Sequence, residues 1–368
     1  MEGAGQACIR SDESGLTAVI EFLSAFTLFL MILTAFMSLA QLEMGSNDTE
    51  IDQVDQATVS GLNYLVGGSG WYVPALQDGS LDHANSTSNW NVVSPEELQK
   101  GRVQTGLVLD GGLDENRLNA LSNVTLESFS KGLGLAEDLT AHLHISVQSS
   151  TNSSRVGLVL FEGGSDINNA RMASTASSVL RMSGDLVTVT LQVHDSGSQT
   201  GKIVMTEVSV RPVSGGPEWI EIYNDNSFAT SLYGWSLNVT SPSSSNNVLF
   251  QSGVISGQSI AIFTGSISSQ IQGNATQVID LGTYGILGTG SMNLLDDGSS
   301  TIELRFTRSG QTQPIVKSRA EWGGQTGLLL GINNALVWDG GNTMNSASWS
   351  VNQIPTPGEV PSGLTNAS

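Results

Sequence analysis

Cysteine is almost absent from this 368-residue chain. The single cysteine, Cys8, excludes an intrachain disulfide and any metal cage that needs several thiolates. Basic residues are also scarce, because 14 lysines and arginines stand against 34 acids and the formal net charge is −20. Nucleic-acid binding requires clustered cations against the phosphates, so the composition predicts no nucleic-acid partner.

Sequence motifs of catalysis are absent too. The chain contains no G-x-S-x-G, no H-E-x-x-H and no phosphate-binding glycine loop. Two histidines, His142 and His144, are two residues apart and therefore share one face of a predicted strand. A zinc site needs further ligands, and His83 and His194 are the only other histidines. We therefore expect no enzyme, no cofactor and no metal site, and interpret His142 and His144 as solvent-facing.

One long apolar run stands out against this polar chain. Residues 16–42 contain a single ionisable side chain, Glu21, and no charge follows it up to Leu42. A helix rises about 1.5 Å per residue, so a bilayer core of about 30 Å needs about 20 apolar residues. Inside lipid every backbone polar group must be paired within the segment, which favours a helix. The sequence predicts a transmembrane helix over 16–43, with membrane lipid as its partner.

The start of this helix resembles a known family. A polar leader over 1–15 ends at Gly15, the apolar run begins at Leu16, and Glu21 follows as its sixth residue. This arrangement resembles the type IV pilin superfamily, in particular its archaeal pilin-like members. The resemblance implies cleavage between Gly15 and Leu16, and an assembly role for Glu21 at the N-terminal amine of a neighbouring subunit. The acidic residues 11–14 depart from the family, which usually has a basic residue before the cut.

Two interpretations of this segment remain open. A carboxylate inside a membrane helix is costly and tends to be functional, which favours assembly through Glu21. Alternatively, Glu21 lies close enough to the lipid headgroups to reach water. In that case the helix is an uncleaved signal anchor and the protein does not polymerise.

The charges around the helix predict its orientation. Arg10 is the only basic residue near either end, and the next is Lys100, so the N-terminus is expected in the cytoplasm and the bulk outside the cell. N-x-[ST] sequons are found only after the helix, and we expect some of them to carry glycans. These sequons begin at Asn47, Asn85, Asn123, Asn152, Asn238, Asn274 and Asn366.

Residues 44–200 are predicted to form an α+β region. Helical apolar spacing predicts a helix over 51–66, which continues the membrane helix or restarts it, and a second helix over 115–131. Strands are expected over 140–147, 156–161 and 186–193, whereas 167–182 are ambiguous. A long helix followed by a loop and a small antiparallel sheet is an order of elements that resembles the pilin layout.

Residues 202–360 are predicted to form a β-sandwich, because many short strands alternate with turns. The turn signal at Asp296-Asp297 could also suggest calcium, but a hairpin turn explains it better. The expected strands cover 203–210, 218–224, 232–237, 259–263, 292–295, 301–306 and 314–318.

Five motifs in this region occur in a fixed order and resemble a lamin tail domain, an immunoglobulin-like sandwich. The resemblance implies an accessory module for binding or scaffolding. The motifs are EWIEIYN at 218–224, GWSL at 234–237, LLDDG at 294–298, SWS at 348–350 and TPG at 356–358.

Four side chains of this region are weighed as candidate site residues. Glu207 and Glu221 could form a carboxylate pair, although acids on an exposed sheet face are common. Trp219 and Tyr223 beside Glu221 would suit contact with a sugar or a peptide, but packing on the sheet is the preferred interpretation.

Together these patterns predict a cell-surface structural protein. It would be a pilin-like subunit, or a membrane-anchored protein, that displays a lamin tail domain for binding or scaffolding. Its expected partners are lipid, itself or other pilin-like subunits, and a surface ligand that the sequence does not identify. It would be a single-pass membrane protein or be released into a pilus-like filament. The alternative is a monomeric membrane-anchored adhesin or ligand-binding module.

Overall fold

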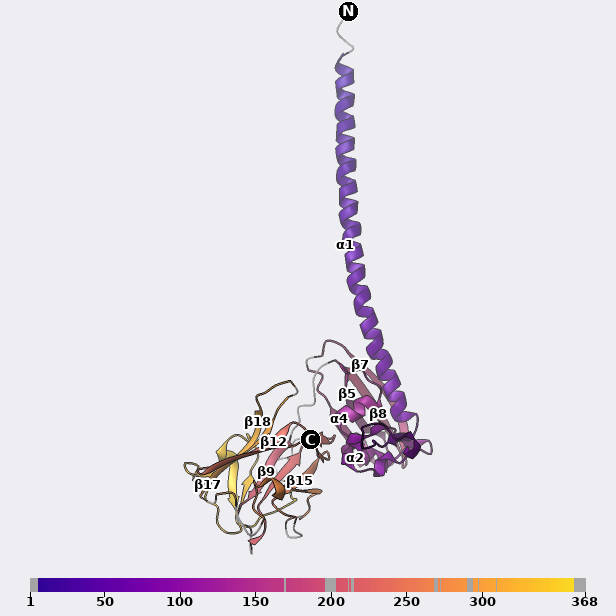
Figure 1. The fold of residues 1–368 in the computed structure, drawn as a ribbon. Helices are drawn as coiled ribbons and strands as arrows, with labels where there is room; N and C mark the ends of the chain where they lie inside the picture. Colours follow the sequence, from indigo (N-terminus) through magenta and orange to yellow (C-terminus); the bar gives the residue numbers. More distant parts are fainter. Residues whose placement is uncertain are drawn as a thin grey trace, which may run out of the picture. The chain divides into compact units, whose positions relative to one another are not determined.

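The structure is a computed structural model, and it divides the chain into two compact units, Met1–Gln56 and Ala57–Ser368, each of which is described by itself. For 6–14 and 41–52 only the backbone is described. Figure 1 draws the fold and labels part of its helices and strands. The described residues are 6–168, 170–195, 203–210, 212, 215–267, 271, 273–289, 294–296, 298–308 and 310–360.

The first unit is helical throughout its described residues, and the helix α1 spans Gln6–Val66. The helix predicted over 51–66 is therefore confirmed as a continuation. The stretch Gly15–Ala40 is long and apolar enough to cross a membrane, and its most apolar part has no buried residue. Its hydroxyl side chains are paired within the helix. Those of Ser24 and Thr27 donate to carbonyls four residues earlier at 2.6 and 2.9 Å, as lipid surroundings require.

The helix expected over 115–131 is broken, which corrects the prediction. It forms α3 (Glu115–Ala120), the 3₁₀ turn η3 (Leu121–Asn123) and α4 (Leu126–Gly132). The reason is Thr125, whose side chain accepts a hydrogen bond from the Ser128 N–H and so begins a new helix as its N-cap. The shorter elements before it are β1 (Gly70–Val73), η1 (His83–Asn85), η2 (Trp90–Val92), α2 (Pro95–Lys100), β2 (Arg102–Thr105), β3 (Val108–Leu109) and β4 (Gly112–Leu113).

A four-stranded antiparallel sheet with the order β6-β5-β8-β7 follows. The ambiguous stretch 167–182 contains a strand from Ala173 to Met182, and this strand forms a hairpin with its successor through Ser183 and Gly184, whose φ angles are +47° and +96°. Positive φ at both turn residues matches the twist of the flanking strands. The strands are β5 (Thr140–Ser149), β6 (Val159–Gly164), β7 (Ala173–Met182) and β8 (Asp185–His194), with η4 (Ser153–Arg155) between the first two.

One face of this sheet packs against the last turns of α1. Leu143 and Leu191 are fully buried on neighbouring strands. Gly61 of α1 approaches so closely that a Cβ there would lie 3.0 Å from Leu191 and 3.6 Å from Leu133. A small residue at 61 is therefore what allows the helix backbone to approach the sheet.

Residues 203–360 form two larger sheets, with the orders β16-β15-β10-β9-β19-β20 and β13-β12-β17-β18. The predicted strand over 292–295 is wrong for its described part, since Leu294 and Leu295 lie in a loop, and 292–293 lie outside the described residues. The elements are β9 (Ile203–Ser209), β10 (Trp219–Asn224), β11 (Thr230–Ser231), β12 (Trp235–Ser241), β13 (Ser244–Leu249), β14 (Val254–Ile255), β15 (Ser259–Thr264), β16 (Gln277–Asp280), η6 (Gly282–Tyr284), β17 (Ser299–Phe306), β18 (Ile315–Gly323), β19 (Ala335–Trp338), η7 (Ser346–Ser348) and β20 (Trp349–Asn352).

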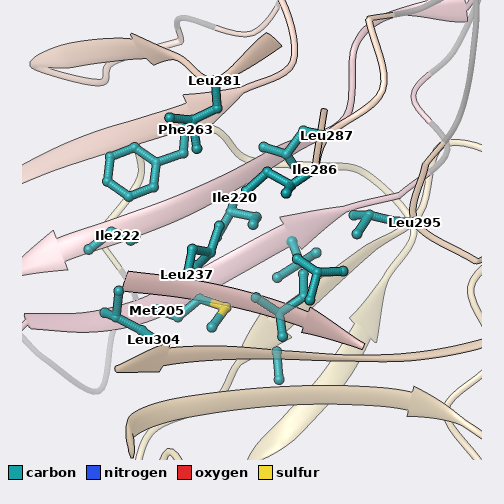
Figure 2. Packing of buried hydrophobic residues seen from close by; sticks show 14 of the residues in the cluster. Met205, Ile220, Ile222, Leu237, Phe263, Leu281, Ile286, Leu287, Leu295 and Leu304 are labelled. Carbon is teal, nitrogen blue, oxygen red and sulfur yellow. The ribbon is translucent and has the colours of Figure 1, made fainter. Parts of the chain in front are cut away.

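A single hydrophobic core joins these two sheets. Ile220 and Ile222 of β10 belong to it together with Leu237 of β12 and Leu304 of β17, and all four are fully buried (Figure 2). Alternate residues of each strand thus face the shared core, as in two stacked sheets. The predicted layout of one long N-terminal helix followed by a largely β-sheet part is confirmed.

The second unit contains two β-rich regions, the first over residues 57–195 and the second over residues 203–360, and they contact each other through Phe228. This fully buried ring lies between Phe129 and Phe161, with centroid distances of 4.9 and 5.0 Å. Main-chain hydrogen bonds flank it, from the Ala229 N–H to the Val124 carbonyl at 3.0 Å among others. An aromatic ring held this way is a packing anchor between the regions.

Candidate functional site

The motif strand β10 is anchored at its start by Glu218. This side chain is fully buried, and its carboxylate accepts hydrogen bonds from the Gly288 N–H at 2.6 Å and from the Leu294 and Leu295 N–H groups at 3.1 Å. The first acid of the EWIEIYN motif therefore holds the loop that contains the LLDDG motif. Its role in this structure is to fix the loop.

Asn224 anchors the other end of the strand in the same way. Its buried amide nitrogen donates to the carbonyls of Phe228, Ile255 and Ser256 at 3.3, 3.0 and 3.0 Å. Its oxygen accepts from the Asn226 N–H at 3.1 Å. Every polar capacity of the amide is thereby used to close the turn after β10.

Between these anchors lies a pair of buried acids. Glu221 of β10 is directly opposite Glu207 of β9, at the point where the register shifts. The two side chains are 1% and 2% exposed. The expectation of acids on an exposed sheet face is therefore wrong. Residues 356–358, which we name the C-terminal strap, bind both acids.

The C-terminal strap contacts the acids through hydrogen-bond donors. The Thr356 N–H donates to Glu207 Oε1 at 3.0 Å, and its hydroxyl donates to Oε2 at 3.2 Å. The Gly358 N–H donates to Glu221 Oε2 at 2.6 Å, and the Thr206 hydroxyl donates to Oε1 at 2.6 Å. Each carboxylate thus receives at least two donors, which offsets part of the cost of its burial.

The sequence of the strap fits this position. Gly358 has a φ of +83°, and a Cβ there would lie 2.2 Å from the backbone nitrogen of Ala275. The Pro357 carbonyl accepts a hydrogen bond from the Asn274 N–H at 3.3 Å. In the TPG motif, the threonine supplies a hydroxyl to Glu207 and the proline fixes the backbone. The glycine is required because its φ is positive and because a Cβ would collide with the backbone of Ala275.

Burial sets the electrostatics of the pair. Desolvation raises the pKa of Glu207 from 4.5 to about 7, against the lowering effect of the hydrogen bonds from Thr356. Desolvation also raises the pKa of Glu221 from 4.5 to about 7, against the hydrogen bonds from Thr206 and Gly358. The negative charge of nearby Glu359 adds to both shifts. The pair can therefore take up and release protons near neutral pH.

Trp219 and Tyr223 are buried, so contact with an external sugar or peptide is excluded by the fold. They are 2% and 8% exposed and pack with Ile260 and Ile262 of β15 on the outer side of the sheet. The preferred interpretation, packing on the sheet, is confirmed. Burial also raises the pKa of the Tyr223 hydroxyl.

The residues predicted for leader cleavage and assembly all lie in α1. A Cβ added at Gly15 would have no neighbour within 4 Å, and Leu16 is 63% exposed. Glu21 is exposed one turn further along. The helix begins at Gln6, so the Gly15–Leu16 bond is helical. Cleavage there and assembly through Glu21 stay predictions.

The predicted sequons differ in their surroundings. Asn85, Asn152 and Asn274 are exposed, whereas Asn123 is half-buried. The amide nitrogen of Asn85 donates to Asp82 at 2.7 Å, and the oxygen of Asn152 accepts from Ser154 at 2.8 Å. Asn366 and the side chain of Asn47 lie outside the described residues.

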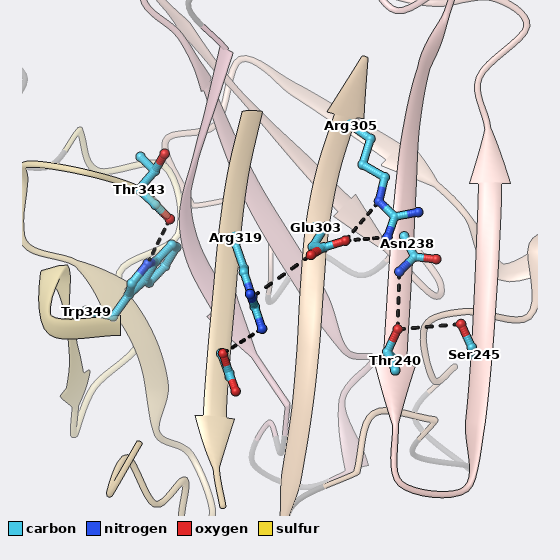
Figure 3. A network of polar contacts seen from close by, with 9 residues as sticks. Asn238, Thr240, Ser245, Glu303, Arg305, Arg319, Thr343 and Trp349 are labelled. Atoms are coloured by element: carbon cyan, nitrogen blue, oxygen red, sulfur yellow. Dashed lines mark hydrogen bonds and ion pairs between the residues drawn. The ribbon is translucent and has the colours of Figure 1, made fainter. Parts of the chain in front are cut away.

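Asn238 is the sequon residue whose burial argues against a glycan. It lies on the outer side of β12, between β13 and β17, and is only 7% exposed. Its amide donates to Thr240 at 3.2 Å beside the ion pairs that join Glu303 to Arg305 and Arg319 (Figure 3). A sugar on this nitrogen would have to displace these neighbours.

The four histidines lie apart in the fold, except for His142 and His144. These two face Glu162, at 3.7 Å from His142 Nε2 to one carboxylate oxygen and 3.7 Å from His144 Nδ1 to the other. His194 is buried and contacts the Ser165 carbonyl at 3.1 Å. Among the residues that the structure describes, no group of three or more His, Cys, Asp or Glu is arranged to hold a metal ion.

The Asp296-Asp297 signal behaves as a turn in its described half. Asp296 Oδ1 accepts from the Gly298 N–H at 2.7 Å, and its carbonyl accepts from the Trp322 indole at 2.9 Å. Asp297 lies outside the described residues. The side chain of Asp296 therefore serves the chain's own backbone, as in turns of this kind.

Sequence reasoning named the acid pair but missed its partner, the C-terminal strap. The signal is the TPG motif at 356–358, which the sequence shows without the acids that it contacts. Comparison with protein-family models gives no match, and comparison with curated proteins gives none either. The function is therefore argued from this chain's own residues.

Proposed function

We propose that this chain is a single-pass membrane protein that displays its β-rich part outside the cell as a structural or scaffolding module. The observation that supports the proposal best is the stretch Gly15–Ala40. It is long and apolar enough to cross a membrane, it lies near the N-terminus, and it is the one helix of this kind among the described residues. Its one carboxylate and its internally paired hydroxyls suit a lipid environment.

The proposal assigns the β-rich part to support and display. In the second region, the buried groups of the EWIEIYN motif fix loops and the strap through hydrogen bonds to the chain itself. This use of motif residues fits a lamin tail-like, immunoglobulin-like sandwich that acts as a rigid module. The long helix followed by the β5–β8 sheet fits a pilin-like subunit.

Two experiments test the proposal. Protease added to intact cells should remove the mass that follows residue 56, whereas full protection of that mass would contradict the extracellular placement. N-terminal sequencing of the membrane-derived protein should start at Leu16 if the chain is processed like a pilin. An intact leader would instead favour the uncleaved anchor.

The alternative proposal is a monomeric anchored adhesin or ligand-binding module, and Glu21 separates the two. On the assembly proposal, Glu21→Gln and Glu21→Leu reach the membrane but lose the cross-linked ladder that the parent forms on intact cells. An unpaired charge in a low-dielectric layer is costly, so pairing with a neighbour's amine would hold the register. Equal ladders from the parent and both variants would remove the assembly role.

A further inference from the structure

An open hollow of about 380 Å³ lies beside η2 and the α3–η3 stretch. In a chain of net charge −20 its lining carries no charged side chain. Four amides offer both donors and acceptors there, and Val92 adds an apolar side chain that is 78% exposed. Such a lining suits an uncharged molecule rich in hydroxyl groups. The lining residues are Asn91, Val92, Asn116, Asn119, Ala120 and Asn123.

Three of these asparagines share one helical face. Asn116, Asn119 and Asn123 are spaced by three and four residues, which aligns them along α3 and η3. Asparagine is a poor helix former, so these three asparagines contribute little to the stability of the helix itself. Within the described part of the chain, the side chains of Asn91, Asn116 and Asn119 make no hydrogen bond. Their amides are therefore available to a ligand.

Asn123 combines this position with a sequon, Asn123-Val124-Thr125. Its amide oxygen accepts a hydrogen bond from the Ser256 hydroxyl at 3.0 Å. That contact orients the amide and leaves Nδ2, the atom that carries an N-linked sugar, without a partner among the described residues. The acceptor atom for a sugar and the surface suited to a sugar are thus adjacent.

The other sequons whose side chains the structure describes lack this combination. The nitrogen of Asn85 is engaged by Asp82, and Asn238 is 7% exposed in a central strand. Asn152 and Asn274 are exposed, but neither lines this hollow. Among these described sequons, Asn123 is the one that lines a hollow able to hold the sugar.

We propose that Asn123 carries an N-linked glycan whose first sugars lie in the hollow, held by the amides of Asn91, Asn116 and Asn119. The inference rests on the proposed extracellular placement. In the transfer, Nδ2 bonds to the anomeric carbon of a phosphate-activated sugar donor. The bond from that carbon to the phosphate oxygen breaks, and the departing phosphate takes the amide proton.

The seated glycan would cover a contact between the two β-rich regions. The Gly257 N–H donates to the Ser122 carbonyl at 2.7 Å, next to the Ser256–Asn123 bond. Sugars in the hollow would exclude water and protease from this contact. A glycan at Asn123 would thereby stabilise the junction as well as mark the surface.

The first experiment is mass spectrometry of peptides from the full chain, purified from the membranes of its own cells. The peptide with Asn123 should be modified in most molecules, and the peptide with Asn238 should be unmodified. Asn123→Gln should abolish the modification at that peptide. Thr125→Ser, which retains a hydroxyl in the sequon and at the helix cap, should retain it.

A second measurement tests whether the first sugars lie in the hollow. Glycan should be released enzymatically from Asn123 in the native protein more slowly than in the unfolded protein. In the double variant Asn116→Ala, Asn119→Ala, the glycan should still be attached but be released several-fold faster. Any glycan at Asn152, on an exposed turn, should be released at the same rate in both proteins. An unchanged rate at Asn123 would overturn the seating.

The outcomes separate this inference from the proposed placement. An unmodified Asn123 in a protein that carries sugar at Asn152 or Asn274 would overturn the inference and leave the placement standing. Sugar at no sequon, with the chain open to protease on intact cells, would do the same. Sugar at no sequon together with full protection from protease would overturn both.

Discussion

Two sets of buried acidic side chains, one in each β-rich region, are stabilised in different ways. In the first region, Asp185 pairs with Arg155 at 2.9 Å, and Asp195 pairs with Arg171 at 3.0 Å. In the second, Glu207 and the acid opposite it are buried together, and the partners that the structure shows for them are N–H and hydroxyl groups. The first site neutralises its acids with cations, whereas the acid pair of the second region is solvated by the chain itself, although Glu303 in that region is paired with Arg305 and Arg319.

The pKa shifts of the acids in the two sites have opposite directions. A hydrogen bond from Ser150, helped by Arg155, lowers the pKa of Asp185 below its usual value. For Glu207 and Glu221 burial outweighs the hydrogen bonds and raises the pKa to about 7. The stability that Asp185 contributes is therefore lost as the pH falls, whereas the stability that Glu207 and Glu221 contribute is lost as the pH rises.

The largest effect is expected from Phe228→Ala, which removes the aromatic anchor between the regions. A buried Phe→Ala change costs about 4 kcal/mol. Because this ring contacts both regions, its loss should split one thermal transition of the full chain into two, measured by calorimetry in detergent. Phe306→Ala, which removes a ring packed on Trp235 at 5.0 Å, is the control and should lower stability without splitting the transition. A single unshifted transition in the Phe228 variant would show that the regions do not depend on this contact.

The next effect concerns the C-terminal strap. In Gly358→Ala the new Cβ would lie 2.2 Å from the backbone of residue 275, at a φ of +83°. We expect a loss of more than about 2 kcal/mol and faster proteolysis after residue 352, because the strap must leave the acids. Gly285→Ala is the matched control, since its φ is +64° but no atom lies within 4 Å, and it should cost about 1 kcal/mol. Equal effects of the two changes would contradict the close approach of the strap.

The acid pair predicts that the second region loses stability as pH rises. The folded pKa of about 7 lies above the ordinary 4.5, so the folded state binds more protons between these values. This stabilisation is fully present below about pH 4.5 and is lost as the pH rises through 7. We expect each acid to contribute a loss of about 2.5 kcal/mol between pH 5 and 8, measured as the melting of the full chain in detergent.

The double variant Glu207→Gln, Glu221→Gln is the test of this pH dependence. Each glutamine keeps an oxygen for the strap donors but has no proton to lose. Its melting temperature should vary much less between pH 5 and 8 than that of the parent. An equally steep dependence in the variant would place the titrating groups elsewhere.

The smallest effect has the opposite sign and belongs to the first region. Because the pKa of Asp185 is lowered, its contribution is present above the ordinary pKa and is lost as the pH falls through the folded value. Asp185→Asn should therefore destabilise the chain at pH 7 and leave it little changed near pH 2. Asp78→Asn is a control on an exposed turn, where hydrogen bonds from Ser80 and no cation lower the pKa, and it should destabilise the chain less at pH 7. A destabilisation that is the same at both pH values would mean that the charged carboxylate, with its partners Ser150 and Arg155, is not its cause.

The sequence was sufficient for features governed by local chemistry. The apolar run after Gly15 predicted the long helix, because the length and hydrophobicity of this run are properties of the segment alone and do not depend on contacts with the rest of the chain. Period-two spacing predicted β10, and the strand appears at Trp219–Asn224. It failed at 115–131, where the apolar spacing suits one helix but the hydroxyl of Thr125 caps a second one. Local capping overrode periodicity there.

The candidate site depended on contacts that sequence spacing does not contain. Glu207 and Glu221 alternate like surface residues on their strands, and only the return of the chain at Thr356 buries them. The hollow around Asn123 likewise needs η2 to meet α3. A sequon is visible in the sequence, but the orientation of its amide toward or away from a partner requires the fold.

The most direct test of the membrane-anchored arrangement uses the near absence of cysteine. In a Cys8→Ser background, Ser153→Cys and Ala347→Cys each place one exposed thiol in one β-rich region. A membrane-impermeant thiol reagent should label both variants on intact cells, whereas the parent, whose only thiol is on the cytoplasmic side or removed with the leader, should stay unlabelled. Labelling of the two variants only after the membrane is made permeable would contradict an extracellular β-rich part.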